Sequence, residues 1–127
     1  MQYPSGNWIQ QIHARVLMEL GGESGTLHPD IVEHCVELSR MAVFGRELAA
    51  TIWRKVAVLL HCLTTRHPFV DGNKRTAWAA ARTLLMLNGY IIEVNATVAE
   101  SMVRSVAEGR LDSEGVARWI QKYSLER

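Results

Sequence analysis

A nine-residue run near the middle of the chain, residues 67–75 (His-Pro-Phe-Val-Asp-Gly-Asn-Lys-Arg), constrains the fold more than any other feature. Apolar residues before it, at positions 52–63, and after it, at 77–84, recur at the three- and four-residue spacing of helices that bury one face. Pro68 lacks a backbone N–H and fixes its own φ, so the first helix has to end before it. The run therefore predicts a short polar loop between two core helices, with Asn73 at or near the start of the second.

The same helical spacing covers most of the chain and predicts an all-α domain. In chain order the apolar stripes are Ile9, Ile12, Val16 and Leu20; Ile31, Cys35, Leu38 and Ala42; Ile52, Val56, Leu59, Leu60 and Leu63; Ala77, Ala80, Ala81 and Leu84; Val98, Met102 and Val106; and Val116, Trp119, Ile120 and Tyr123. The boundary signals are Gly21-Gly22, Pro29, Asn88-Gly89, Asn95 or Thr97, and Asp112 or Ser113. Residues 90–94 are short, β-branched and expected to be extended.

Composition bounds the class of protein. A chain of 127 residues with 48% hydrophobic residues predicts one domain, 1–127, with a single core. The net charge of +1 favours neither nucleic acid nor an anionic membrane as a partner. Residues 1–7 lack a signal-peptide pattern and no apolar run reaches membrane length, so we expect a cytosolic protein. Cys35 and Cys62 lie in helical apolar patterns, which predicts two buried thiols rather than a disulfide.

The start of the second core helix is the expected phosphate site. The first N–H groups of a helix have no intrahelical acceptor, and the helix dipole favours an anion there. Gly72 allows the backbone to approach a ligand closely, and Asn73 and the amides after Gly72 would cradle a phosphate. Lys74 and Arg75 would add charge-assisted contacts.

The remaining side chains of the run suggest chemistry. Histidine titrates near neutral pH, so His67 can serve as a general base. Asp71 is the natural ligand for magnesium held by one carboxylate plus phosphates. Phe69 is expected to anchor the loop in the core. Asp71-Gly72-Asn73 alone is typical of an ordinary turn, but the full run favours a functional phosphate-binding loop.

The run 67–75 resembles the signature of the Fic/Doc family: His-Pro-Phe, two residues, Gly-Asn, Gly or Lys, Arg. The resemblance implies a compact Fic-type helical domain, which can carry a short β flap. It assigns the base to His67, the metal to Asp71 and phosphate contacts to Asn73, Lys74 and Arg75, with ATP and Mg²⁺ bound.

Two departures bear on the reaction. Adenylyl-transferring members have Gly at the Lys74 position and a second Arg at the Trp78 position. Both changes resemble the Doc (death-on-curing) toxin branch, which transfers the γ-phosphate of ATP to a protein hydroxyl. A kinase is therefore our first hypothesis; an adenylyltransferase and a catalytically inactive binding module are the alternatives. For Trp78, packing in the interior is favoured over covering the nucleotide base.

The resemblance also implies partners. Doc toxins modify a threonine of translation elongation factor Tu. Family members hold their target as an added strand against a flap, here expected at residues 41–47. An inhibitory helix within the chain would need Ser or Thr four positions before Glu108 or Glu114, but Arg104 and Arg110 stand there. A separate antitoxin is the expected source of restraint.

Overall fold

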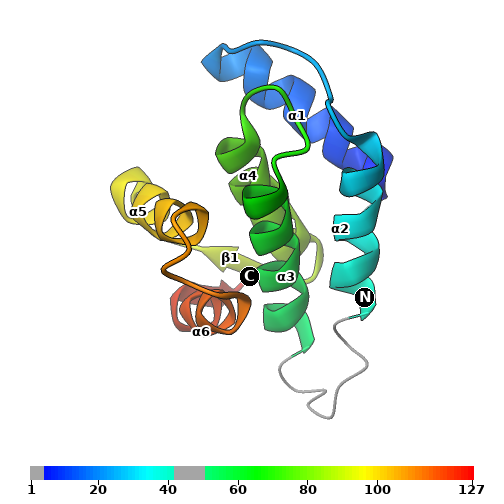
Figure 1. Ribbon diagram of the computed structural model, residues 1–127. Coiled ribbons are helices and arrows are strands. Elements are labelled where there is room, and N and C mark those ends of the chain that lie inside the picture. Colours follow the sequence, from blue (N-terminus) through cyan, green and yellow to red (C-terminus); the bar gives the residue numbers. More distant parts are fainter. Residues whose placement is uncertain (1–4, 42–50) are drawn as a thin grey trace.

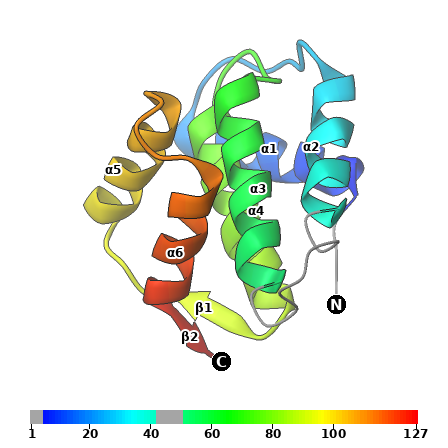
Figure 2. The same ribbon diagram turned by 60° about the horizontal axis from the view of Figure 1, so that its bottom comes forward.

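The computed structural model describes residues 5–41 and 51–127, which form a helical bundle built around two central antiparallel helices. The helices are α1 (Gly6–Leu20), α2 (Pro29–Met41), α3 (Thr51–Arg66), α4 (Asn73–Leu87), α5 (Ala96–Ala107) and α6 (Ser113–Tyr123). Figure 2 shows α3 and α4 side by side in the middle, with α2 on one side, α5 and α6 on the other, and α1 passing behind the central pair. The prediction of a compact all-α domain with the loop 67–72 between two core helices is confirmed.

The core lies where α3 and α4 meet the outer helices. Every apolar residue of the predicted stripe on α3 is buried, and the alanines on α4 allow the two helix backbones to approach closely. The buried residues that form this core on α3 and α4 are Ile52, Val56, Ala57, Leu59, Leu60, Cys62, Leu63, Ala77, Ala80, Ala81, Leu84 and Leu85. The site loop is therefore held between two rigid elements.

Side-chain caps explain several of the helix boundaries. Ser5, Asn95 and Asp112 each accept a hydrogen bond from a backbone N–H in the first turn of α1, α5 and α6. Of the alternatives that the sequence left open, Asn95 and Asp112 are the capping residues. Pro29 occupies the first position of α2, as predicted.

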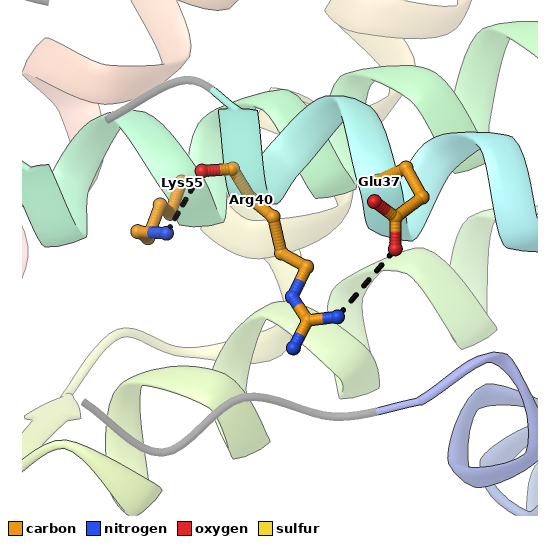
Figure 3. Close-up of polar contacts among 3 residues, drawn as sticks. All are labelled: Glu37, Arg40 and Lys55. Carbon is orange, nitrogen blue, oxygen red and sulfur yellow. Dashed lines mark hydrogen bonds and ion pairs between the residues drawn. The ribbon is translucent and has the colours of Figure 1, made fainter. Parts of the chain in front are cut away.

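Lys55 caps the carboxyl end of α2 (Figure 3). Its ammonium group donates to the carbonyl of Arg40 at 3.0 Å, and the Arg40 side chain reaches back to Glu37 at 3.5 Å. The Ser39 hydroxyl donates to the carbonyl of Lys55 at 2.5 Å, so the two helices exchange side-chain contacts at this point. Burial, with a smaller contribution from Arg40, lowers the pKa of Lys55 from its ordinary value of 10.5.

A two-stranded antiparallel sheet closes the domain. The extended segment expected at residues 90–94 is β1 (Tyr90–Ile92), and it pairs with β2 (Ser124–Glu126), with Ile91 opposite Leu125. The β2 strand was not predicted, because three residues after a helix carry too little period-2 pattern to identify a strand. The pairing ties the last residues to the end of α4, where Arg127 donates to the carbonyls of Gly89 and Met86.

Two predictions for α2 were wrong. Cys35 and Cys62 form a disulfide between α2 and α3 rather than two thiols, because the packing of these helices brings their Cα atoms to 5.5 Å. The buried face of α2 is formed by Val32, Cys35, Val36 and Ser39. Leu38, which the sequence placed on that face, is 43% exposed, and Ala42 lies outside the described residues. Two overlapping stripes share Cys35, and spacing alone does not choose between them.

Candidate functional site

The loop that joins α3 to α4 begins in a backbone conformation that is rare for its residue. His67 follows the last residue of α3 and has a φ of 48°, in the left-handed region that Gly usually occupies. A left-handed residue just after a helix is a common way to end it, but for a residue with a Cβ it costs about 1–2 kcal/mol. His67 is exposed, and the loop that it begins lies at one end of the bundle. The fold thus accepts backbone strain at His67.

Phe69 fastens the middle of the loop to the core. Its side chain is only 1% exposed, and its ring stacks on that of His13 from α1, with centroids 3.8 Å apart and planes within 8°. His13 is itself buried, and its Nε2 lies 2.8 Å from the carbonyl oxygen of Asp71. The loop therefore rests on α1 through both a ring contact and a hydrogen bond.

Asn73 spans the loop with its side chain. Its Oδ1 accepts from the N–H of Phe69 and its Nδ2 donates to the carbonyl of Phe69, both at 3.0 Å. The side-chain amide, expected from the sequence to contact a phosphate, thus holds the loop backbone in its turn. The backbone N–H of Asn73 is at the start of α4, where it has no intrahelical acceptor.

The segment between α1 and α2 supports the loop from the side. Val70 donates its N–H to the carbonyl of Gly25 at 3.1 Å, and Leu27 donates to the carbonyl of Pro68 at 2.8 Å. The two segments form an antiparallel bridge between Thr26 and Phe69. The loop is therefore paired like a short strand along one side.

Asp71 presents an exposed carboxylate beside the start of α4. Its Oδ1 accepts from the N–H of Gly72 at 2.9 Å, and its Oδ2 accepts from the N–H of Glu23 at 3.3 Å. No cluster of three or more His, Cys, Asp or Glu side chains able to hold a metal occurs in residues 5–41 and 51–127. Any magnesium bound by Asp71 would therefore take most of its ligands from phosphate and water, which is usual for this ion.

The start of α4 is free of a side-chain cap. Gly72 is the N-cap residue, with left-handed angles of φ 79° and ψ 17°. The N–H of Thr76 makes the first backbone bond of the helix, to the carbonyl of Gly72 at 2.9 Å, so the amides of residues 73–75 precede it. Lys74 and Arg75 extend from this first turn and are exposed, and no carboxylate in the described part of the chain forms an ion pair with either. The turn is therefore suited to bind an anion.

Two other residues near the run make contacts elsewhere and are not assigned a role in ligand binding. Trp78 packs edge-on against Trp119 of α6, with ring centroids 6.0 Å apart, so it belongs to the interior contact between α4 and α6. Arg66 lines an open groove between α2 and α3, together with His34, Leu38 and His61 among others. Neither residue is part of the first turn of α4.

Sequence reasoning missed the residues that hold the loop from a distance. No role was predicted from the sequence for His13 or for the segment 22–28. The position of His13 among apolar residues of α1, facing the core, was one available signal. The glycines at 22 and 25 were another: both have positive φ, and side chains there would meet Asp71 and Val70.

The expected flap at residues 41–47 falls almost entirely outside the described residues. The end of α2 and the start of α3 lie at the end of the bundle opposite the loop 67–72 (Figure 1). The segment that pairs with the loop is residues 25–28, between α1 and α2.

Comparisons with known proteins agree with this arrangement. The family model described as Fic/DOC matches residues 3–85, which include the loop and everything that supports it. The chain is also 36% identical, over 99 residues, to a protein of Mycolicibacterium smegmatis named Toxin Doc, and the match covers 76% of each protein. Among the helices that the structure describes, none has the length and apolar character needed to cross a membrane.

Proposed function

The chain belongs to the Fic/DOC family, and from that premise we propose that it is a Doc-like toxin that transfers the γ-phosphate of ATP to a Ser or Thr hydroxyl of a protein. The observation that carries the proposal is the start of α4, where unpaired amides and the adjacent Lys74 and Arg75 form one cationic turn. That turn lies just after the strained His67 and the exposed carboxylate of Asp71. A base, a metal ligand and an anion site are thus within one short loop.

Each group has a role in such a transfer. His67 takes the proton from the target hydroxyl, whose oxygen then forms the bond to the γ-phosphorus as the bond to ADP breaks. The N–H groups of residues 73–75 and the cations of Lys74 and Arg75 stabilise negative charge on the phosphates. The side chain of Asn73 keeps the turn in shape through its two bonds to Phe69.

Asp71 is the residue that would hold magnesium. Its carboxylate is exposed and accepts hydrogen bonds only from backbone N–H groups of neighbouring turns among the described residues, so it can turn toward a cation. Magnesium bound there would neutralise charge on the phosphates of ATP. One carboxylate combined with phosphate oxygens fits the donor set of this ion.

The target segment is proposed to lie along residues 24–27. Because Gly25 and Leu27 direct their backbone bonds toward the loop, the N–H and C=O of Thr26 face the other edge. An extended peptide could pair with that edge by β-augmentation, which would bring a hydroxyl close to His67. Elongation factor Tu is the target that the family resemblance suggests.

A transfer assay tests the proposal directly. The protein is incubated with bacterial elongation factor Tu, magnesium and ATP labelled at either the α- or the γ-phosphate, with His67→Ala as the matched control. We expect γ-label on the target with wild type and none with His67→Ala. An α-label on the target would instead establish the adenylyltransferase, and the absence of both labels, also in a whole translation extract, would favour the inactive binding module.

Growth of a bacterial host tests the toxin and its restraint. Expression of the wild-type chain alone should arrest growth, whereas His67→Ala at the same protein level should not. The exposed loop would need a separate antitoxin to cover it. A flexible segment of that antitoxin can fold as it binds the loop. Equal growth of the two strains at high expression would contradict the toxin proposal.

A further inference from the structure

His13 is a buried titratable residue that touches the loop but has no role in the transfer described above. It lies in α1 with 4% of its surface exposed. Its ring stacks on Phe69, and its Nε2 contacts the carbonyl oxygen of Asp71 at 2.8 Å. A buried imidazole nitrogen needs a hydrogen-bond partner, and for His13 that partner is a carbonyl of the loop, 58 residues away in sequence.

The direction of this hydrogen bond is fixed by its partners. A carbonyl oxygen can only accept, so Nε2 of His13 carries the proton and donates. The peptide bond between Asp71 and Gly72 is thereby held at both ends, with its C=O bound by His13 and its N–H bound by Oδ1 of Asp71. The peptide plane cannot rotate without losing both bonds.

The orientation of this peptide determines what the start of α4 offers to a ligand. Gly72 is left-handed and has many accessible conformations, so its own backbone does little to fix the turn. The ring of His13 lies close to Gly72, since a Cβ built there would be 3.8 Å from Nε2. If Asp71 turns toward magnesium, its bond to Gly72 is given up and His13 remains as the polar contact that holds the peptide.

We propose that His13 is a positioning residue for phosphate transfer: its Nε2–H holds the Asp71–Gly72 peptide so that the amides of residues 73–75 converge on the phosphate. The proposal rests on the proposed function for its catalytic consequence. The loop geometry that it explains can be measured without any substrate.

Matched substitutions separate the hydrogen bond from the packing. His13→Phe keeps an aromatic ring against Phe69 but removes the donor. His13→Gln removes the ring but carries an amide N–H that reaches about as far as Nε2. Ile9→Val, on the same buried face of α1, weakens packing without touching the hydrogen bond. If His13→Phe does not fold, the smaller His13→Leu takes its place.

The first measurement is the kinetics of γ-phosphate transfer. We expect kcat/KM of His13→Phe to fall roughly tenfold to a hundredfold, because small misplacements of a preorganised site have effects of this size. His13→Gln should recover most of the loss, and Ile9→Val should transfer like wild type. Wild-type kinetics in His13→Phe, or equal losses in His13→Phe and His13→Gln, would overturn the proposal.

The second measurement is amide hydrogen exchange in the free protein. The N–H of Thr76 donates to the carbonyl of Gly72, so its exchange reports on the turn. It should exchange faster in His13→Phe and at nearly the wild-type rate in His13→Gln. If wild type transfers no phosphate, the proposed function fails, while this exchange pattern still supports the positioning role and unchanged exchange in His13→Phe overturns it.

Discussion

Two short connections in this domain each end one helix and begin the next, but they are held in opposite ways. The connection from α5 to α6, residues 108–112, is held by its own neighbours. Gly109 provides the left-handed residue, with φ 76°, and Arg110 donates its N–H to the carbonyl of Ser105. Asp112 then caps α6 by accepting from the N–H of Gly115 at 2.8 Å.

The loop from α3 to α4 departs from each of these solutions. His67 occupies the left-handed position that Gly occupies in the other connection. The N-cap Gly72 has no side chain to cap α4. Besides the local bonds of Asn73 to Phe69 and of Asp71 to Gly72, the loop is held by His13 and the segment 23–28, which are far away in sequence. Local rules are broken where the chemistry is proposed, and distant contacts compensate for the loss.

Replacing the residue at the strained position should give the largest effect. We expect His67→Gly and His67→Ala each to lower transfer about 10²–10⁴-fold, the usual contribution of a general base. His67→Gly should also be more stable than His67→Ala by roughly 1 kcal/mol, and so unfold at a higher temperature, because Gly adopts positive φ without the Cβ penalty. Thermal melts and kinetics on the same samples check both parts. Unfolding of His67→Ala would show that the side chain is structural.

A pair of glycine substitutions comes next in size. Gly72 and Gly109 have nearly the same φ, 79° and 76°, so Gly72→Ala and Gly109→Ala should each cost about 1–2 kcal/mol of stability. Only Gly72→Ala should also lose transfer, roughly tenfold or more, because it displaces the amides that follow. Denaturation curves and initial rates compare the two. Equal rates in both variants would mean that the turn after Gly72 is not part of the site.

Removing the cap of α6 should affect stability alone. Asp112→Ala deletes the acceptor for the N–H of Gly115, which typically costs about 1 kcal/mol. Transfer measured well below the melting temperature should remain at the wild-type level. A loss of transfer in the folded variant would link the α5–α6 connection to the site and weaken the contrast between the two loops.

The smallest expected effect concerns a third helix end, the carboxyl end of α2. The pKa of Lys55 is lower in the folded chain than its ordinary 10.5. As pH rises, the folded state gives up this proton before the unfolded state does, so stability increases across the interval between the two values. The stability of wild type relative to Lys55→Met should therefore grow with pH in that alkaline range.

Urea denaturation at neutral pH and near pH 10 measures this difference. Lys122→Met, which removes an exposed lysine, serves as the control. Its stability relative to Lys55→Met should grow with pH as much as that of wild type does. A constant difference between wild type and Lys55→Met at both pH values would contradict the prediction.

The sequence predicted those parts of the fold that depend on local pattern. Apolar spacing placed the buried residues of α3 and α4, and Pro68 with Gly72 placed the loop between them, because both signals act within a few residues. The two wrong predictions, which placed Leu38 on the buried face of α2 and left Cys35 without a disulfide, have another origin. They depend on which helices pack together, and periodicity does not carry that information.

The candidate site also has features that follow from local sequence and features that depend on which helices pack together. The residues of the run from His67 to Arg75 could be assigned roles from side-chain chemistry, and those roles stay predictions until tested. The support that His13 and Thr26 give to the loop could not be predicted. It depends on the packing of α1 and the following segment against the loop at the amino end of α4, and sequence spacing does not report such packing. The sequence of the loop also did not determine whether the Asn73 side chain would hydrogen-bond to a ligand or to the loop backbone.

The distance between His13 and Asp71 along the chain has a consequence for how the protein is made. During synthesis α1 leaves the ribosome first, and the loop follows only after the two helices between them. The loop can take its final shape only when α4 has formed and docked on α1, so a partly synthesised chain lacks the assembled turn. A chain in which α1 later detached from the loop would lose the contacts of His13 with that turn. The proposed activity therefore depends on α1 being docked against the loop and the start of α4, and it reports on that part of folding.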